Sequence, residues 1–418
     1  MSFTRDRVQQ RDAGMYGTME GLLLARRGIG SGSTGGQAVS KTTVATIPAV
    51  HRAWSFAANA VAMLTMGVWK GDGVIPTRVT GSQAARLFTG VPNPRQDWYR
   101  FWYTVAKSLE ARNSGYVWKT KNAAGQVIAL TALHPDQVFP FLYQVTNSEL
   151  QYPVMFSPYY PTPPGVDTYG VVTVDRETIW HIRGDGGIGE QVPMTPIQTF
   201  ATSLGIALAK QDYEANLYEN GVMGGLAVTF PDNKTREQAR DWMAMFDADQ
   251  AGTGNSGKTK VIGGGATMTQ IGMTPKDAQF IESGIASMQD VANITGVPKW
   301  VLNIDDKAEK GQSPEQDEAR WFHHGLKPRL ARICSSLSAE PDIFGPGATA
   351  WPMFDTADSI HPDSLTAAEI SLGKVQSGQW TPDEARAKDG LPPHANGVGQ
   401  IPQQTPVGGA PNPAAASE

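Results

Sequence analysis

The segment at residues 274–298 constrains the fold most, because it carries a helix start, an apolar face and a helix stop. Thr274 is suited to the N-cap, and Asp277 places a carboxylate near the positive end of the helix. Apolar residues then recur at steps of three and four: Ala278, Ile281, Ile285, Met288 and Ala292. Gly296 and Pro298 supply the stop. The sequence therefore predicts one long amphipathic helix with a single packing face.

Length, charge and cysteine content set outer limits on the fold and on the partners. At about 150 residues per domain, 418 residues correspond to about three domains. A formal net charge of -5 argues against tight wrapping of nucleic acid, which needs clustered Lys and Arg. The single cysteine, Cys334, excludes a disulfide within the chain and suits a reducing compartment. Its apolar neighbours Ile333 and Leu337 indicate a buried, unreactive thiol rather than a nucleophile.

The two ends of the sequence and its apolar runs bear on export and on membranes. Gly and Pro concentrate at residues 28–36 and from residue 391 onward, which predicts disordered ends. Residues 1–14 are polar and charged, unlike a secretory signal. The most apolar run, at residues 57–69, is shorter than the roughly 20 residues that span a bilayer. We therefore expect a soluble protein without a membrane partner.

The first half of the chain alternates helical and strand patterns. A helix is predicted within residues 43–69 and leads into an extended segment that ends at Lys70. A second helix, rich in aromatic residues, is predicted over residues 98–109. Residues 115–138 alternate like two hairpin strands around a turn at residues 122–125, and further strands are predicted over residues 169–183.

The second half carries two long helices that flank a small insert. Thr195 and Pro196 predict the start of the first helix, which runs to residue 220. The insert at residues 222–272 reads as a strand, a helix and a strand, at residues 225–230, 234–250 and 259–262. The second long helix is the one at residues 274–298.

Beyond the second long helix, the pattern predicts a charged loop at residues 303–311 and then a helix with a capping box at Ser313. Pro328 interrupts this helix, because proline lacks a backbone N–H, and a kink is expected there. Two short helical patterns follow within residues 365–391.

A nucleotide-binding motif is present and has to be weighed against its context. Gly252 to Thr259 satisfies the pattern of a phosphate-binding loop at every defined position. Such a loop works when a buried strand enters it and a helix leaves it. Here the preceding residues have a helical pattern, and the following ones begin a strand that breaks at three glycines. A mobile loop is the favoured interpretation, and a nucleotide site is kept as the alternative.

Other chemical groups give weaker patterns. His323 and His324 are adjacent, so on a helix they point in different directions and cannot share a metal ion. Asp305 and Asp306 are surrounded by charges of alternating sign, which favours a solvated loop over a magnesium site. An aromatic cluster suits a hydrophobic helix face and a subunit interface better than base stacking: Trp98, Tyr99, Phe101, Trp102 and Tyr103. No catalytic, cofactor or metal residues are assigned.

Several of these segments resemble tailed-bacteriophage portal proteins. The resemblance begins with the helix and strand near residues 43–70 and includes an L-x-P-x-x-V element at residues 133–138. It continues in the His181-Ile182 strand, the Gly-rich loop and the helix start at Thr195, where the family usually has Ser. The order of helix, small insert and helix is the most specific part. The resemblance covers residues 44–395.

The resemblance implies an α+β portal fold with an α/β wing, a two-helix stem, a small strand-helix-strand clip, a tunnel helix and a helical C-terminal crown. The implied division is a flexible segment at 1–43, the wing at 44–195, the first stem helix at 196–221, the clip at 222–272, the second stem helix at 273–298, the tunnel loop and helix at 299–337, a wing return and crown at 338–390, and a disordered tail at 391–418.

The implied function is that of a phage portal protein, a ring of typically twelve copies at one capsid vertex. Double-stranded DNA would pass through it in packaging and ejection. The implied partners are the large terminase subunit, a head-tail adaptor, and the major capsid protein or a scaffold. The implied location is the virion, and the host cytoplasm during assembly. The alternatives are an ATPase that uses Gly252 to Thr259 and a non-viral structural ring.

Two sets of residues are candidates for contact with DNA and with docking proteins. The predicted tunnel loop supplies the DNA-channel candidates Asp305, Asp306, Lys307 and Lys310. The predicted clip supplies the docking candidates Thr253, Asn255, Lys258 and Lys260. A few lysines among carboxylates would allow contact with passing phosphates without strong adhesion.

Overall fold

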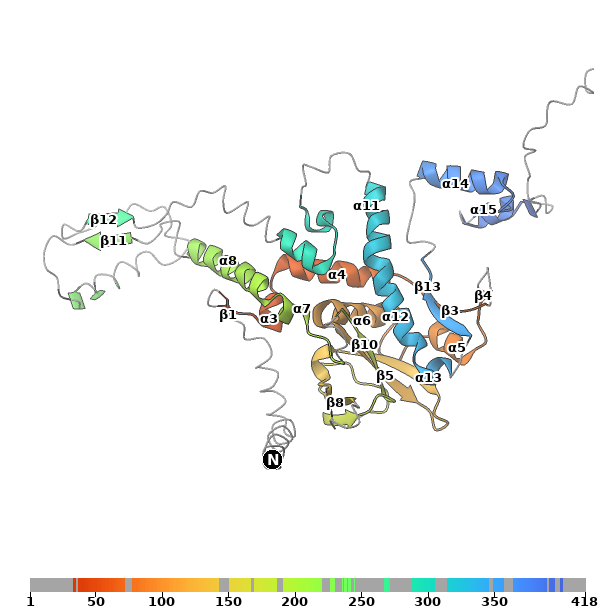
Figure 1. Ribbon diagram of the computed structural model, residues 1–418, viewed down its shortest axis with the longest axis horizontal. Helices are drawn as coiled ribbons and strands as arrows, with labels where there is room; N and C mark the ends of the chain where they lie inside the picture. Colours follow the sequence, from red (N-terminus) through yellow and green to blue (C-terminus); the bar gives the residue numbers. More distant parts are fainter. Residues whose placement is uncertain are drawn as a thin grey trace, which may run out of the picture. The chain divides into compact units, whose positions relative to one another are not determined.

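The computed structural model describes most of the chain between residues 33 and 400. The described residues are 33–34, 37–71, 77–142, 150–166, 169–185, 191–219, 226–229, 235, 237–238, 240–241, 244, 267–270, 288–304, 314–345, 349–356, 364–388, 391–394 and 399–400. The chain divides into two units: one comprises residues 1–310 and 323–355, and the other residues 311–322 and 356–418. The fold is mixed α and β, as predicted (Figure 1).

The helices of the N-terminal half begin where the sequence supplies caps. The side chain of Ser40 caps α3 (Lys41–Val44), and α4 (Pro48–Ala62) starts with Pro48 in its first turn. Ser82 and Asp97 accept hydrogen bonds from the backbone N–H groups of Ala85 and Arg100, which start α5 (Gln83–Thr89) and α6 (Trp98–Arg112). The helix predicted within 43–69 is thus confirmed as α4, and the one at 98–109 is confirmed as α6.

The described strands form five small antiparallel sheets. The largest hairpin joins β5 (Ser114–Lys121) to β6 (Val127–Leu133), and Gly125 has a φ of 76° in its turn, as the predicted hairpin requires. The strand β10 (Ile179–Arg183) pairs with β5 and gives the order β10-β5-β6. Three of the other described sheets are as follows. The strand β3 (Met66–Lys70) pairs with β4 (Thr77–Arg78) and β13 (Ala350–Phe354). The strand β8 (Leu150–Phe156) pairs with β7 (Phe141–Leu142) and β9 (Gly170–Val174), and β1 (Ser33–Thr34) pairs with β2 (Gln37–Ala38).

The first predicted stem helix has an irregular start. Thr195 and Gln198 form the capping box of α7 (Pro196–Thr199), which confirms the predicted cap. The helix then breaks at Phe200, with φ of −110° and ψ of 26°, before α8 (Ala201–Glu219) continues. The sequence predicted one continuous helix and did not foresee this break.

The insert between the long helices is described in part. The strand β11 (Leu226–Thr229) falls within the predicted strand, and it pairs antiparallel with β12 (Thr267–Gln270). The strand β12 was not predicted from the sequence, in which the partner strand was placed at residues 259–262. Those residues lie outside the described ones. The phosphate-loop motif, Gly252 to Thr259, lies outside them as well.

The C-terminal part of the second predicted stem helix is described, and it ends at the predicted stop signal. Residues 288–295 are helical, and Gly296 follows with a φ of 63°, the left-handed conformation that ends a helix. Pro298 then precedes the short helix η3 (Lys299–Leu302). The start of this predicted helix, from Thr274, lies outside the described residues.

The C-terminal helices follow the predicted interruption at Pro328. The helix α11 (Pro314–Trp321) passes into a π-helical turn, η4 (Phe322–Leu326), and α12 (Lys327–Ser338) then begins with Pro328 in its first turn. Proline has no N–H for the carbonyl four residues earlier and its ring crowds that carbonyl, so a wider turn relieves the contact. The short α13 (Pro341–Phe344) leads toward β13, and the predicted C-terminal patterns form α14 (Ser364–Gln376) and α15 (Pro382–Lys388).

Two apolar clusters position the elements of the larger unit. One joins α3 and α4 to α7, α8 and residues 291–304, through side chains that include Trp54, Ile197, Leu204, Val291 and Val301. The other lies between the β5-β6-β10 sheet and β8, around Tyr116, Leu133, Tyr152 and Ile179. The helix α6 packs on α4 and against β5 and β6 (Figure 1). Across the described residues, no helix combines the length and the hydropathy needed to cross a membrane.

Candidate functional site

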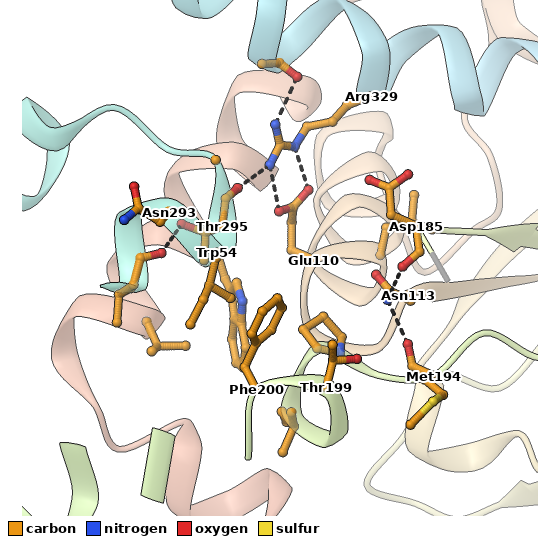
Figure 2. A pocket seen from close by; sticks show the side chains of 18 of the residues that line it. Trp54, Glu110, Asn113, Asp185, Met194, Thr199, Phe200, Asn293, Thr295 and Arg329 are labelled. Atoms are coloured by element: carbon orange, nitrogen blue, oxygen red, sulfur yellow. Dashed lines mark hydrogen bonds and ion pairs between the residues drawn. The ribbon is translucent and has the colours of Figure 1, made fainter. Parts of the chain in front are cut away.

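A cavity of the described structure lies where the predicted wing meets the predicted stem. It has a volume of about 620 Å³ and is lined by α4, α6, α7, the start of α8, residues 291–296 and α12 (Figure 2). Its apolar wall includes Val50, Trp54, Ile197 and Leu204. Its polar wall includes Glu110, Asn113 and Arg329. We call the residues that line this cavity the junction.

Arg329 on α12 bonds two distant segments and the turn before its own helix at the junction. Its Nε and Nη2 atoms donate to the two carboxylate oxygens of Glu110 on α6, at 2.6 and 3.0 Å. Nη2 also donates to the carbonyl of Thr295 at 2.6 Å, and Nη1 donates to the carbonyl of Gly325 at 2.9 Å (Figure 2). The guanidinium therefore connects α6, the end of the helix at 288–295, and the π-helical turn.

The electrostatics of this group follow from its partner. Burial by itself lowers the pKa of Arg329, but the hydrogen bonds and charge of Glu110 outweigh that effect and raise it. The side chains of Arg329 and Glu110 are 17% and 13% exposed. A bidentate pair of this kind fixes orientation as well as distance, so the junction is held in one geometry.

Local sequence explains why a guanidinium binds at this place. A helix that ends in a left-handed glycine leaves its last carbonyls without intrahelical donors, and the helix dipole makes that end negative. Gly296 ends the helix in this way, and its amide bonds the carbonyl of Ala292 at 2.8 Å. The free carbonyl of Thr295 then accepts from Arg329. The predicted stop signal thus creates the acceptor.

Asn113 forms the second fixed point of the junction. It ends α6 in a left-handed conformation, with φ of 52°. Its Nδ2 donates to the carbonyls of Asp185 and Met194, at 2.5 and 2.7 Å, and its own carbonyl accepts from Gly184 at 2.7 Å (Figure 2). A Cβ atom on Gly184 would lie 2.7 Å from the Cα of Asn113, so this backbone approach requires glycine.

The candidate residues named from the sequence are not among the described residues. The channel candidates Asp305, Asp306, Lys307 and Lys310 fall outside the described residues, between Ile304 and α11. The docking candidates Thr253, Asn255, Lys258 and Lys260 also fall outside them. Both sets therefore stay predictions.

Sequence reasoning missed Arg329, Glu110 and Asn113. Glu110 and Arg329 are 219 positions apart, and no local pattern pairs residues at that separation. Asn113 does carry a local signal: it follows the apolar period of α6 and precedes Ser114 and Gly115, and asparagine is a common left-handed helix stop.

The aromatic cluster of α6 and Cys334 behave as ordinary structural residues. On α6, Phe101 and Trp102 are buried while Tyr99 is exposed and stacks on Tyr103, which confirms a hydrophobic helix face. Cys334 was predicted to be buried and is half-buried instead; burial still raises its pKa to about 11, which fits an unreactive thiol. Within the described part of the chain, no group of three or more His, Cys, Asp or Glu side chains is placed to hold a metal ion.

The chain matches phage portal proteins over most of its length. Residues 48–390 match the family described as phage portal protein, and the chain therefore belongs to that family. It is 21% identical over 369 residues to the portal protein of Enterobacteria phage HK97, covering 88% of this chain and 84% of that protein. It is 25% identical over 234 residues to a probable portal protein of Streptomyces phage phiC31, covering 53% of this chain and 49%, about half, of that relative.

Solved structures show the same fold. An HK97-family phage portal protein from Corynebacterium diphtheriae aligns with a TM-score of 0.56 and 16% identity, covering 78% of this chain and all of that one. A chain from the neck of a native gene transfer agent particle, computed with C12 symmetry, aligns with a TM-score of 0.55 and 18% identity, covering 85% of this chain and 92% of that one. The portal fold predicted from the sequence is confirmed at this level.

Proposed function

We propose that this chain assembles into a ring of twelve copies at one capsid vertex and forms the channel for double-stranded DNA in packaging and ejection. The family match over residues 48–390 carries the proposal. The fold similarity to a particle neck computed with C12 symmetry supports the twelvefold ring. The chain acts in this proposal as a structural component without a catalytic role. It works in the virion and is assembled in the host cytoplasm.

Exposed apolar side chains near the junction support association with further copies. Five large ones are exposed in the single chain, on or near α7, α8 and η3: Val192, Met194, Phe200, Ile206 and Trp300. Contiguous exposed apolar patches are typical of interfaces, and we propose that these five side chains belong to one. A ring follows when one copy uses two different surfaces head to tail and the rotation closes.

Two matched substitutions test the ring. Ile206 on α8 and Ile128 on β6 are 56% and 57% exposed, so the two sites are matched in exposure. We expect Ile206→Asp to shift the light-scattering mass from a closed ring to smaller species, because a carboxylate would be buried at the interface. Ile128→Asp should retain the ring. A wild-type protein that stays monomeric with its capsid partners present would contradict the proposal.

The channel and docking roles rest on the family relation and on residues outside the described structure. We propose that Asp305, Asp306, Lys307 and Lys310 face the DNA. In the same way, Thr253, Asn255, Lys258 and Lys260 dock the large terminase subunit and later the head-tail adaptor. The major capsid protein or a scaffold holds the ring at the vertex. If deletion of residues 253–256 left packaging and head completion unchanged, the docking role would be wrong.

Two alternatives predict different results. An ATPase that uses Gly252 to Thr259 should bind ATP and lose it in Lys258→Ala, while the proposed ring should assemble equally well with and without that change. A non-viral structural ring should be encoded away from terminase and capsid genes, whereas a portal gene should lie beside them.

A further inference from the structure

A second cavity, of about 320 Å³, lies at the free edge of strand β10. Among the described strands β10 pairs with β5 alone, so its other edge is open. Trp180 on one side of the strand donates to Ser336 of α12 at 2.9 Å, and His181 on the other side contacts Tyr152 of β8. A cavity lined by both α12 and Tyr152 therefore opens at the strand edge.

The lining of this cavity is rich in hydrogen-bond donors and positive charge. Arg176, His181 and Arg183 come from β10 and the turn before it, and α12 contributes Arg332 with the hydroxyl groups of Ser335 and Ser336. The strand alternation puts the backbone N–H of His181 on the open edge, because the even-numbered residues around it bond to β5. We call these residues the arginine pocket.

The carboxylates near the arginine pocket are already engaged. Glu340 lines the cavity, but its Oε2 accepts from Nζ of the buried Lys119 at 2.6 Å. Arg332 is paired with Asp185. Asp175 precedes Arg176, but its Oδ1 accepts from the amide and the hydroxyl of Thr178, both at 3.2 Å. Among the described residues, no carboxylate pairs with Arg176 or Arg183, and two positive charges are left uncompensated.

His181 adds an unsatisfied polar atom to the same place. Its Nε2 is buried and makes no hydrogen bond within the described structure, while its Nδ1 lies 3.4 Å from the hydroxyl of Tyr152. Burial first, and then the charges of Arg183 and Arg176, lower the pKa of His181 to about 3, so the ring is neutral near pH 7. When the Tyr152 hydroxyl donates to Nδ1, Nε2 carries the hydrogen and is a buried donor without an acceptor.

We infer that the arginine pocket binds an oxyanion, that is, a phosphate, sulfate or carboxylate group. Guanidinium groups bind these planar or tetrahedral oxygen sets with paired hydrogen bonds, and the serine hydroxyl groups and the backbone N–H of His181 satisfy the remaining oxygens. Two sources can supply the group. One is a free phosphate ion, and the other is the carboxylate of an acidic side chain on another copy of the chain.

Titration of the purified full chain with inorganic phosphate tests the pocket, by calorimetry at constant ionic strength. We expect saturable binding of one phosphate per chain, weakened at least tenfold in Arg176→Gln and in Arg183→Gln. Both arginines are exposed, and melting curves check that each variant is folded. Arg86→Gln is the matched control, because Arg86 is an exposed arginine on α5 outside the cavity.

The outcomes are separable. Absence of saturable binding, or equal binding in Arg183→Gln and Arg86→Gln, would overturn the inference. Retained binding in the control with loss in both pocket variants would support it. A second experiment rests on the proposed ring and compares its assembly mass in phosphate and in chloride, without sulfate. If saturating phosphate lowers the mass of the wild-type assembly more than chloride does, a carboxylate of another copy is the source. An unchanged mass identifies the free ion. Failure of the ring itself leaves the phosphate titration of the single chain intact as a test.

Discussion

Replacing Arg329 with methionine should release the junction while keeping a long apolar side chain. The substitution removes both bonds to Glu110, at 2.6 and 3.0 Å, and one donor from each of the carbonyls of Thr295 and Gly325. Glu110 then carries a charge in a place where its side chain is only 13% exposed. The lost free energy comes mainly from this unpaired carboxylate.

The expected size of the loss follows from burial. Removing one partner of a fully buried ion pair costs about 3–5 kcal/mol, and the partial exposure of this pair brings that to about 2–3 kcal/mol of unfolding free energy. In a large domain each kcal/mol of lost unfolding free energy lowers the Tm by roughly 2–4 °C, so the Tm should fall by roughly 4–12 °C.

A double-mutant cycle isolates the pair from general packing effects. Urea and thermal melts of Arg329→Met, Glu110→Gln and the double variant should give a coupling free energy of about 1–2 kcal/mol. Arg329→Lys should recover only part of the stability, because an ammonium group cannot bind both carboxylate oxygens and both carbonyls in this geometry. The control is Arg86→Met, an exposed arginine on α5, for which a change within about 0.5 kcal/mol is expected. Additive losses at Arg329 and Glu110, or a loss no larger than that of the control, would refute the reasoning.

Three further changes have defined outcomes. Burial opposes ionisation of Asp342, but Lys121 and Lys119 outweigh it and hold its pKa below the ordinary value. Asp342 therefore contributes to stability above its unfolded pKa of about 3.9, and this contribution is lost as the pH falls through its lower folded pKa. In melts at decreasing pH, the stability of Asp342→Asn should fall less steeply than that of the wild type. Gly184→Ala should cost about 1–3 kcal/mol because its Cβ meets the backbone of Asn113, whereas Gly81→Ala, with nothing within 4 Å, should be neutral. Iodoacetamide should alkylate Cys334 slowly near neutral pH and faster toward the pKa of about 11, and fast labelling at pH 7 in the folded state would contradict that.

Local signals in the sequence predicted the ends of elements well. Thr195 with Pro196, the turn that ends at Gly125, and Gly296 all act where they were expected, because caps, turns and left-handed stops depend on a few adjacent residues. The strand β12 was missed because the insert has several short apolar runs, and strand pairing is decided by a distant partner.

The contacts of the junction could not be predicted from local sequence patterns, for a different reason. Phe200 has the apolar spacing of a continuous helix, yet the chain breaks there, where α7 packs on α6 and α8 continues. The pairing of Arg329 with Glu110 and of β13 with β3 joins parts of the chain more than 200 positions apart. Both contacts depend on the packed fold. The family resemblance implied that the chain returns to the wing near its C-terminal part, whereas composition gave no indication of it.

The two predicted stem helices meet in one apolar cluster, and the second has a charged contact in addition. The start of the first helix enters the cluster with Ile197 and Leu204, and the end of the second enters it with Val291 and Val297. Apolar contacts of this kind have little directional preference. The end of the second helix is also bonded to the guanidinium of Arg329, whose hydrogen bonds fix both distance and orientation. We infer that, in the proposed ring, this contact keeps the end of the second helix fixed against α6 when neighbouring copies or DNA shift.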